Sequence, residues 1–192
     1  MPYRIPPTRA DIEIANAVAD YTNPPAEEAA SVLTLGADEH LLLAIAAGWW
    51  LYCRRGSPRR RRNSDHILAT TLAVSVLPHL LKSIFDQERP DRLTLRGHLH
   101  GVPVSGKPND AFPSGHAMHV GALASAASVL PPAERNVVWA FGASLALTRI
   151  VLLAHWASDV VAGLALGALT ERLLRFCTGY GAAEHERTPP PG

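Results

Sequence analysis

The chain alternates between apolar blocks and short polar segments along most of its 192 residues. The apolar blocks cover about residues 40–53, 67–85, 116–130, 137–153 and 156–169, and they contain few charged side chains. Most charges lie near the two ends of the chain and in two of the connecting segments. Long stretches with few charges are typical of helices that cross a bilayer, so the pattern predicts about five such helices.

The two ends of the chain differ from this central region. Residues 1–37 are polar overall, but Ile12, Ala15 and Val18 have the spacing of one helix face, which predicts an amphipathic, interfacial arm. Residues 38–178 form the expected transmembrane domain, and the proline-rich tail 179–192 is expected to be disordered.

These observations predict an all-α, polytopic membrane bundle of about five to six transmembrane helices. A sixth segment would have to come from the N-terminal arm. A soluble all-α bundle stays open as an alternative, because several blocks are shorter than the roughly 20 residues that a span requires.

Composition adds little, since 47% apolar residues, a mean hydropathy of +0.05 and a net charge of +1 are ordinary values. The distribution of charge is more informative, because six arginines lie between Arg54 and Arg62. Positively charged loops stay in the cytoplasm, so segment 86–112 and the turn at 153–156 should face outward. We interpret the arginines as a topology signal and expect no nucleic-acid partner.

The localisation predicted from these features is the bacterial inner membrane. Residues 1–20 contain no apolar core of the signal-peptide type, so insertion would rely on the internal blocks, and arginine and alanine are frequent.

Chemically active residues gather in three short segments at the predicted outer ends of the helices. The segments are Lys82 to Pro90, Pro113 to His116, and Thr148 to Asp159. Helices that alternate in direction would bring all three to one face of the membrane.

Three cations in these segments predict a site for a phosphate group. Lys82, Arg89 and Arg149 would be costly near lipid unless an anion neutralised them, and arginine suits bidentate contact with phosphate. Ser114 and Gly115 open a helix, whose free N–H groups and positive dipole end also favour an anion.

Two histidines could supply the reaction. His155 and Asp159 are four residues apart, so the carboxylate could fix the ring and free its other nitrogen to attack phosphorus. His116 is placed to protonate the leaving oxygen and then to activate water. The predicted substrate is a lipid phosphate held at the outer face of the bilayer.

The three segments together resemble the type 2 phosphatidic acid phosphatase superfamily, which includes vanadium-dependent haloperoxidases. The pattern K-x6-R-P, P-S-G-H and S-R-x5-H-x3-D matches in order and spacing over roughly residues 66–176, with Thr148 in place of the usual serine. The resemblance implies a reaction without metal or other cofactor and, in bacterial members, an extracytoplasmic site. It implies the following roles: His155 as nucleophile, His116 as acid and base, Asp159 as orienter, and Lys82, Arg89, Ser114, Gly115 and Arg149 as phosphate ligands.

Several alternatives remain open at this point. The substrate could be phosphatidic acid, phosphatidylglycerol phosphate or undecaprenyl pyrophosphate. The protein could instead be a vanadate-dependent haloperoxidase, or a membrane protein that binds phospholipid without turning it over. His98 and His100, with Asp91 and Asp110 as nearby carboxylates, could form a metal site, although their spacing is not typical of one.

Overall fold

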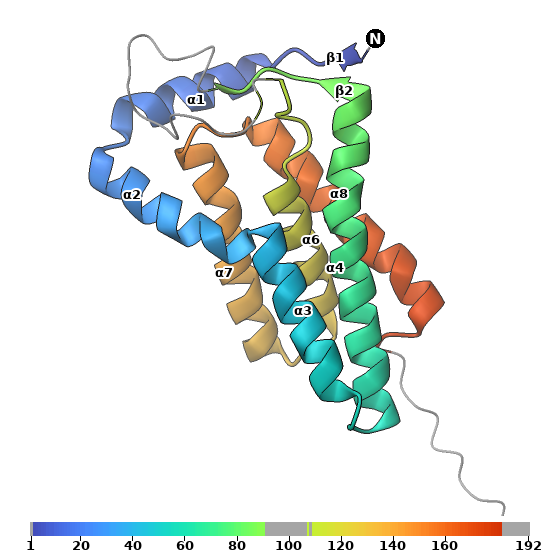
Figure 1. Cartoon of the computed structure of the whole chain (residues 1–192). Helices are drawn as coiled ribbons and strands as arrows, with labels where there is room; N and C mark the ends of the chain where they lie inside the picture. Colours follow the sequence, from blue (N-terminus) through green and yellow to red (C-terminus); the bar gives the residue numbers. More distant parts are fainter. Residues whose placement is uncertain (1, 91–106, 108, 182–192) are drawn as a thin grey trace, which may run out of the picture.

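The computed structural model describes residues 2–90, 107 and 109–181, and it is mostly helical, as the sequence predicts. In chain order the elements are β1 (Tyr3–Arg4), α1 (Arg9–Tyr21), α2 (Pro24–Leu33), η1 (Thr34–Ala37), α3 (Glu39–Cys53), α4 (Pro58–Ile84), β2 (Phe85–Asp86), α6 (Gly115–Ala126), η2 (Ala127–Val129), α7 (Pro132–Val151) and α8 (Ala157–Thr178). The helices α3, α4, α6, α7 and α8 form the bundle, and α1 lies across its upper end (Figure 1). The tail 179–192, which the sequence predicts to be disordered, lies almost entirely outside the residues that the structure describes.

The apolar blocks correspond to the helices of the bundle. Within the described residues, Pro24–Cys53 and Pro58–Ile84 are long and apolar enough to cross a membrane, judged by length and composition alone. The outer surfaces of the bundle helices also carry large apolar side chains exposed at their surface. Examples on four helices are Ile45, Leu51, Leu72, Val76, Leu80, Val137, Phe141, Leu147, Val161, Leu169 and Leu173. Side chains of this kind on the outside of a bundle suit contact with lipid.

Helix α4 begins earlier than its apolar block predicts. The side chain of Ser57 accepts a hydrogen bond from the N–H of Arg60, and Pro58 occupies the first helical turn. Both are favourable at a helix start, so the last four arginines of the run are helical rather than part of a loop. The connection between α3 and α4 lies at the lower end of the bundle (Figure 1).

The N-terminal arm is folded against the bundle. In α1 the buried Ala15 and Ala19 pack with Ala111, Leu153 and Trp156. The structure also contains a pair of very short parallel strands, β1 and β2, which the sequence pattern does not predict. They join the start of the chain to the upper end of α4 (Figure 1).

Helices α6 and α8 make the closest contact in the bundle, and glycines permit it. At Gly121, a side chain would overlap the backbone of Leu164 in α8. At Gly167, it would overlap the backbone of Met118 in α6. Small residues allow helix backbones to approach in this way in membranes. This contact sets how far apart the starts of the two helices lie.

A buried polar cluster joins α4, α6 and α8 near the lower end of the bundle. Nε2 of His66 lies 3.0 Å from a carboxylate oxygen of Glu171, and both side chains are fully buried. Ser125 donates a hydrogen bond of 2.6 Å to the other oxygen of Glu171. Arg175 donates to the carboxylate at 2.9 Å. Because a buried charge is costly without partners, this cluster ties the three helices together.

The glycine contact leads to a stability prediction. We expect Gly167→Ala to lower the temperature at which the detergent-purified protein loses its monodisperse peak by about 3–10 °C, since overpacking costs roughly 1–3 kcal/mol. Gly48→Ala is the matched control, because nothing lies within 4 Å of the added methyl group in α3. Equal midpoints for the two variants would show that the α6–α8 contact is looser than described.

Candidate active site

A cavity of about 430 Å³ opens near the upper end of the bundle, where α4 ends and α6 begins. It gathers the three motif segments, which are separated in the sequence. Six of the eight predicted site residues line it: Lys82, Arg89, Gly115, His116, Arg149 and His155. The other two, Ser114 and Asp159, are fully buried behind its wall.

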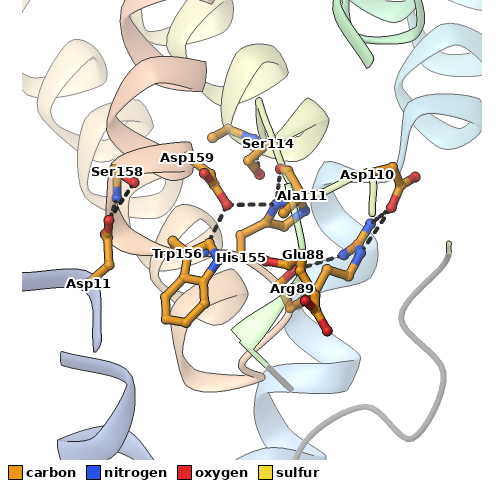
Figure 2. A network of polar contacts seen from close by, with 12 residues as sticks. Asp11, Glu88, Arg89, Asp110, Ala111, Ser114, His155, Trp156, Ser158 and Asp159 are labelled. Atoms are coloured by element: carbon orange, nitrogen blue, oxygen red, sulfur yellow. Dashed lines mark hydrogen bonds and ion pairs between the residues drawn. The ribbon is translucent and has the colours of Figure 1, made fainter. Parts of the chain in front are cut away.

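The cations Arg89 and Lys82 share one carboxylate. Arg89 donates to Asp110 Oδ1 from Nε at 3.0 Å and from Nη2 at 2.7 Å. Its Nη1 donates to the carbonyl of Ala154 at 2.8 Å. Lys82 Nζ lies 3.6 Å from Asp110 Oδ2. Sequence reasoning considered Asp110 only as a metal ligand and missed this role (Figure 2).

The third cation, Arg149, is held from a different direction. Its Nη1 donates a hydrogen bond of 3.0 Å to the hydroxyl of Thr34, which belongs to η1. Its Nε is buried and has no hydrogen-bond partner within the described part of the chain. A buried guanidinium with spare donors beside a cavity is suited to bind an anion.

His155 lies in the turn between α7 and α8, and its partners define its state. Nδ1 lies 2.7 Å from the carbonyl oxygen of Ala111, which can only accept a hydrogen bond. Nδ1 therefore carries the proton, and in the neutral ring Nε2 keeps a lone pair. Burial, together with the positive charges of Arg149, Arg89 and Lys82, lowers the pKa of His155 well below its usual range. The ring is therefore neutral near pH 7.

Asp159 lies farther from His155 than the sequence spacing suggests. Its Oδ2 is 3.7 Å from His155 Nδ1, which is beyond hydrogen-bond distance. The same oxygen accepts a hydrogen bond of 2.9 Å from the N–H of Trp156, as Figure 2 shows. In this structure the carbonyl of Ala111 is thus the direct partner of the ring, and orientation by Asp159 stays a prediction.

The start of α6 forms another wall of the cavity. Ser114 is the N-cap, and its hydroxyl accepts a hydrogen bond from the N–H of Ala117. The N–H of Ser114 donates to the carbonyl of Asp159 at 3.2 Å, which joins the starts of α6 and α8. Gly115 and His116 follow at the cavity wall, so the free N–H groups of this first turn border the same space.

Sequence reasoning missed the part of the cavity that the N-terminal region supplies. Ser31, Thr34, Asp38, Glu39 and His40 all line it, although no motif marks them. Helix α4 adds a further histidine. Nε2 of His79 lies 3.5 Å from a carboxylate oxygen of Glu39.

The metal-site alternative finds no support among the residues described, where no group of three or more His, Cys, Asp or Glu side chains is arranged to hold a metal ion. His98, His100 and Asp91 lie outside the described residues. His119 of α6 also lines the cavity.

Comparison with known proteins gives consistent results. The lipid A 1-phosphatases of Rhizobium johnstonii and Rhizobium etli are 38% and 37% identical to this chain over 104 and 103 residues. These matches cover 54% and 53% of this chain but only 43% and 44% of the relatives, so less than half of each relative is matched.

Two solved structures share the fold. LpxE from Aquifex aeolicus aligns with a TM-score of 0.72 at 17% identity, covering 87% of this chain and 95% of that chain. The first transmembrane PAP2-type phosphatidylglycerolphosphate phosphatase from Bacillus subtilis aligns with a TM-score of 0.62 at 22% identity, covering 88% and 85%.

The family assignment follows from the longest sequence match. The model of the PAP2 superfamily matches residues 66–180, more than half of the chain, and this region contains every predicted site residue. The chain therefore belongs to the PAP2 superfamily.

Proposed function

We propose that this protein is an integral membrane phosphatase that removes phosphate from a lipid phosphate, with His155 as nucleophile and without a metal ion. The observation that carries the proposal is that three cations and the motif histidines His116 and His155 line one cavity. The family and the two lipid A 1-phosphatase relatives support the same class of reaction.

The proposed reaction has two steps. In the first, the Nε2 lone pair of His155 forms a bond to phosphorus while the bond to the leaving oxygen breaks. His116 gives its proton to that oxygen. In the second, a water molecule attacks the phosphohistidine, His116 takes a proton from the water, and the electrons of the phosphorus–nitrogen bond return to Nε2.

The cations stabilise the charge on the equatorial oxygens in both steps. Arg149 offers its Nε, which has no hydrogen-bond partner among the described residues, to one of them. Arg89 and Lys82 are paired with Asp110, so binding the substrate requires that they share their donors between the carboxylate and the anion.

The arrangement of charge supports a cavity on the extracytoplasmic side. The α3–α4 connection, which begins the arginine run, lies at the lower end of the bundle, and the end of α4 near the cavity lies at the upper end (Figure 1). If the arginines stay in the cytoplasm, the cavity faces out. We propose that α3, α4, α6, α7 and α8 are the spans, with the N-terminal arm on the outer face of the bacterial inner membrane.

Four lipid phosphates are candidate substrates. Phosphatidic acid, phosphatidylglycerol phosphate and undecaprenyl pyrophosphate all carry a phosphate group that a cavity lined by three cations could bind. The two Rhizobium relatives add lipid A carrying a 1-phosphate, and we place it first among the substrates to test.

The decisive experiment measures phosphate release by the detergent-purified protein from these four lipids and a soluble phosphomonoester, with chelator present. We expect release from at least one lipid, unaffected by chelator, and a loss of at least about 10³-fold in kcat for His155→Ala. His40→Ala is the control, because it removes an exposed histidine from the rim of the same cavity.

Each other outcome contradicts a specific part of the proposal. Inhibition by chelator would contradict metal independence, and an active His155→Ala would contradict the assignment of the nucleophile. No release from any lipid would contradict the lipid phosphatase itself and would favour a haloperoxidase or a phospholipid-binding protein.

A second prediction concerns the carboxylate that competes with phosphate. We expect Asp110→Asn to lower the inhibition constant of inorganic phosphate by about tenfold, equal to ~1.4 kcal/mol. The reason is that the substitution removes a negative charge beside Arg89 and Lys82, which would otherwise repel the phosphate. The measurement is phosphate inhibition of phosphomonoester hydrolysis, with Asp20→Asn, an exposed site on α1, as control. A higher inhibition constant would mean that Asp110 chiefly holds Arg89 in place for the anion.

A further inference from the structure

A carboxylate of the N-terminal arm is buried beside the proposed catalytic turn. Asp11 lies in the first turn of α1, and only 2% of its surface is exposed. It accepts hydrogen bonds from the N–H and the hydroxyl of Thr8 at 2.9 and 2.7 Å. It also accepts from the N–H and the hydroxyl of Ser158 at 2.9 and 2.8 Å. The last two bonds join residues 147 positions apart in the chain (Figure 2).

These bonds make Asp11 a cap for a helix other than its own. Ser158 lies in the first turn of α8, whose free N–H groups need acceptors, and a negative charge at a helix start is favourable. Asp159 accepts the N–H of Trp156 in the same turn. Burial alone would raise the pKa of Asp11, but the hydrogen bonds from Ser158 and Thr8 outweigh it and lower the pKa below its usual value. The carboxylate is therefore ionised at neutral pH.

The capped turn directly follows the residue proposed as nucleophile. His155 is three residues before Ser158, and the intervening Trp156 is buried against Ala15 and Ala19 of α1. The indole N–H of Trp156 donates to the carbonyl of Glu88 at 2.7 Å, next to Arg89 (Figure 2). Movement of this turn would thus displace the ring of His155.

The same arm also contacts the Lys82–Pro90 segment and a second residue of the Thr148–Asp159 segment. The N–H of Ile5 donates to the carbonyl of Asp86 at 2.9 Å, beside the strand pair that precedes Arg89. Thr34 binds Arg149 at the far end of the arm. All three contacts lie within residues 1–37, which belong to no motif and precede the region that the family model matches.

We propose that Asp11 is a positioning residue for the phosphatase reaction, and that it acts by holding the first turn of α8, and with it His155, in line with the bound phosphate. The inference rests on the proposed function for its kinetic readout. Asp11 itself does not line the cavity, so its effect is on the geometry of attack and not on phosphate binding.

The test compares Asp11→Asn with Thr8→Ala. The first variant removes the charge and weakens the bonds from Ser158. The second removes the Thr8 hydroxyl, which caps α1 and donates to Asp11, but leaves the carboxylate and both bonds from Ser158 in place. We expect kcat of Asp11→Asn to fall about 10- to 100-fold, because a small misplacement of reacting groups has effects of this size. KM and the inhibition constant of inorganic phosphate should change by less than about twofold, since the cations are untouched.

A second measurement does not depend on activity. Amide hydrogen exchange over residues 154–160 should be faster in Asp11→Asn than in Thr8→Ala or the unchanged protein, at equal thermal stability. Asp11→Glu, which keeps the charge, should recover part of kcat.

These readouts separate the inference from the proposed function. If no lipid is hydrolysed by the unchanged protein, the proposed function fails, and the exchange rates alone decide whether Asp11 holds the turn. The inference is overturned if exchange in 154–160 is unchanged, if kcat stays within about threefold, or if Thr8→Ala loses as much kcat as Asp11→Asn.

Discussion

The close approach of α6 and α8 is the constraint on which the site depends. Gly121 and Gly167 let the two helix backbones touch, and a side chain at either position would force them apart. Because both helices begin at the upper end of the bundle, this contact brings Ser114 next to Asp159, whose carbonyl accepts the Ser114 N–H. The wall that carries His116 and the turn that carries His155 are therefore placed by backbone contact, which is stiffer than contact between long side chains.

Three like charges can lie close together in the site because nearby acceptor groups offset them. Three cations converge on one cavity, and their mutual repulsion is relieved by Asp110, by carbonyl oxygens and by the hydroxyl of Thr34. Burial and the same positive charges keep His155 neutral, which is the form that the proposed attack on phosphorus requires. At the lower end of the bundle, His66 and Glu171 pair with each other, and neither lines the cavity of the candidate site. Thus buried charge stabilises one end and remains available to a ligand at the other.

The sequence predicts the helical class and the residues that line the cavity because both have local signals. Apolar blocks mark helices, and the spacing of Lys82, Arg89, His116, Arg149 and His155 marks the motif. Helices that alternate in direction then bring the motif segments to one end. The start of α4 is less predictable, because the capping by Ser57 and Pro58 outweighs the polarity of the arginines that follow.

The contacts that the sequence does not predict are those between distant segments. The carbonyl of Ala111 as partner of His155 has no side-chain signature at all. Asp110 could be recognised as an acidic residue, but not as the partner of Arg89, 21 positions earlier in the chain. Asp11 and Thr34 lie in a region without motifs, so only the fold shows that they reach the motif segments.

The position of the arm has a consequence for the order in which the molecule assembles. The buried alanines of α1 and α2, Ala15, Ala19 and Ala30, pack against Ala111 and residues between 151 and 156. Residues 9–33 are synthesised before these partners, so α1 and α2 cannot complete this packing until the chain has been made to residue 156. The two helices are therefore separated from their packing partners during synthesis by more than 100 residues, apart from Ala111.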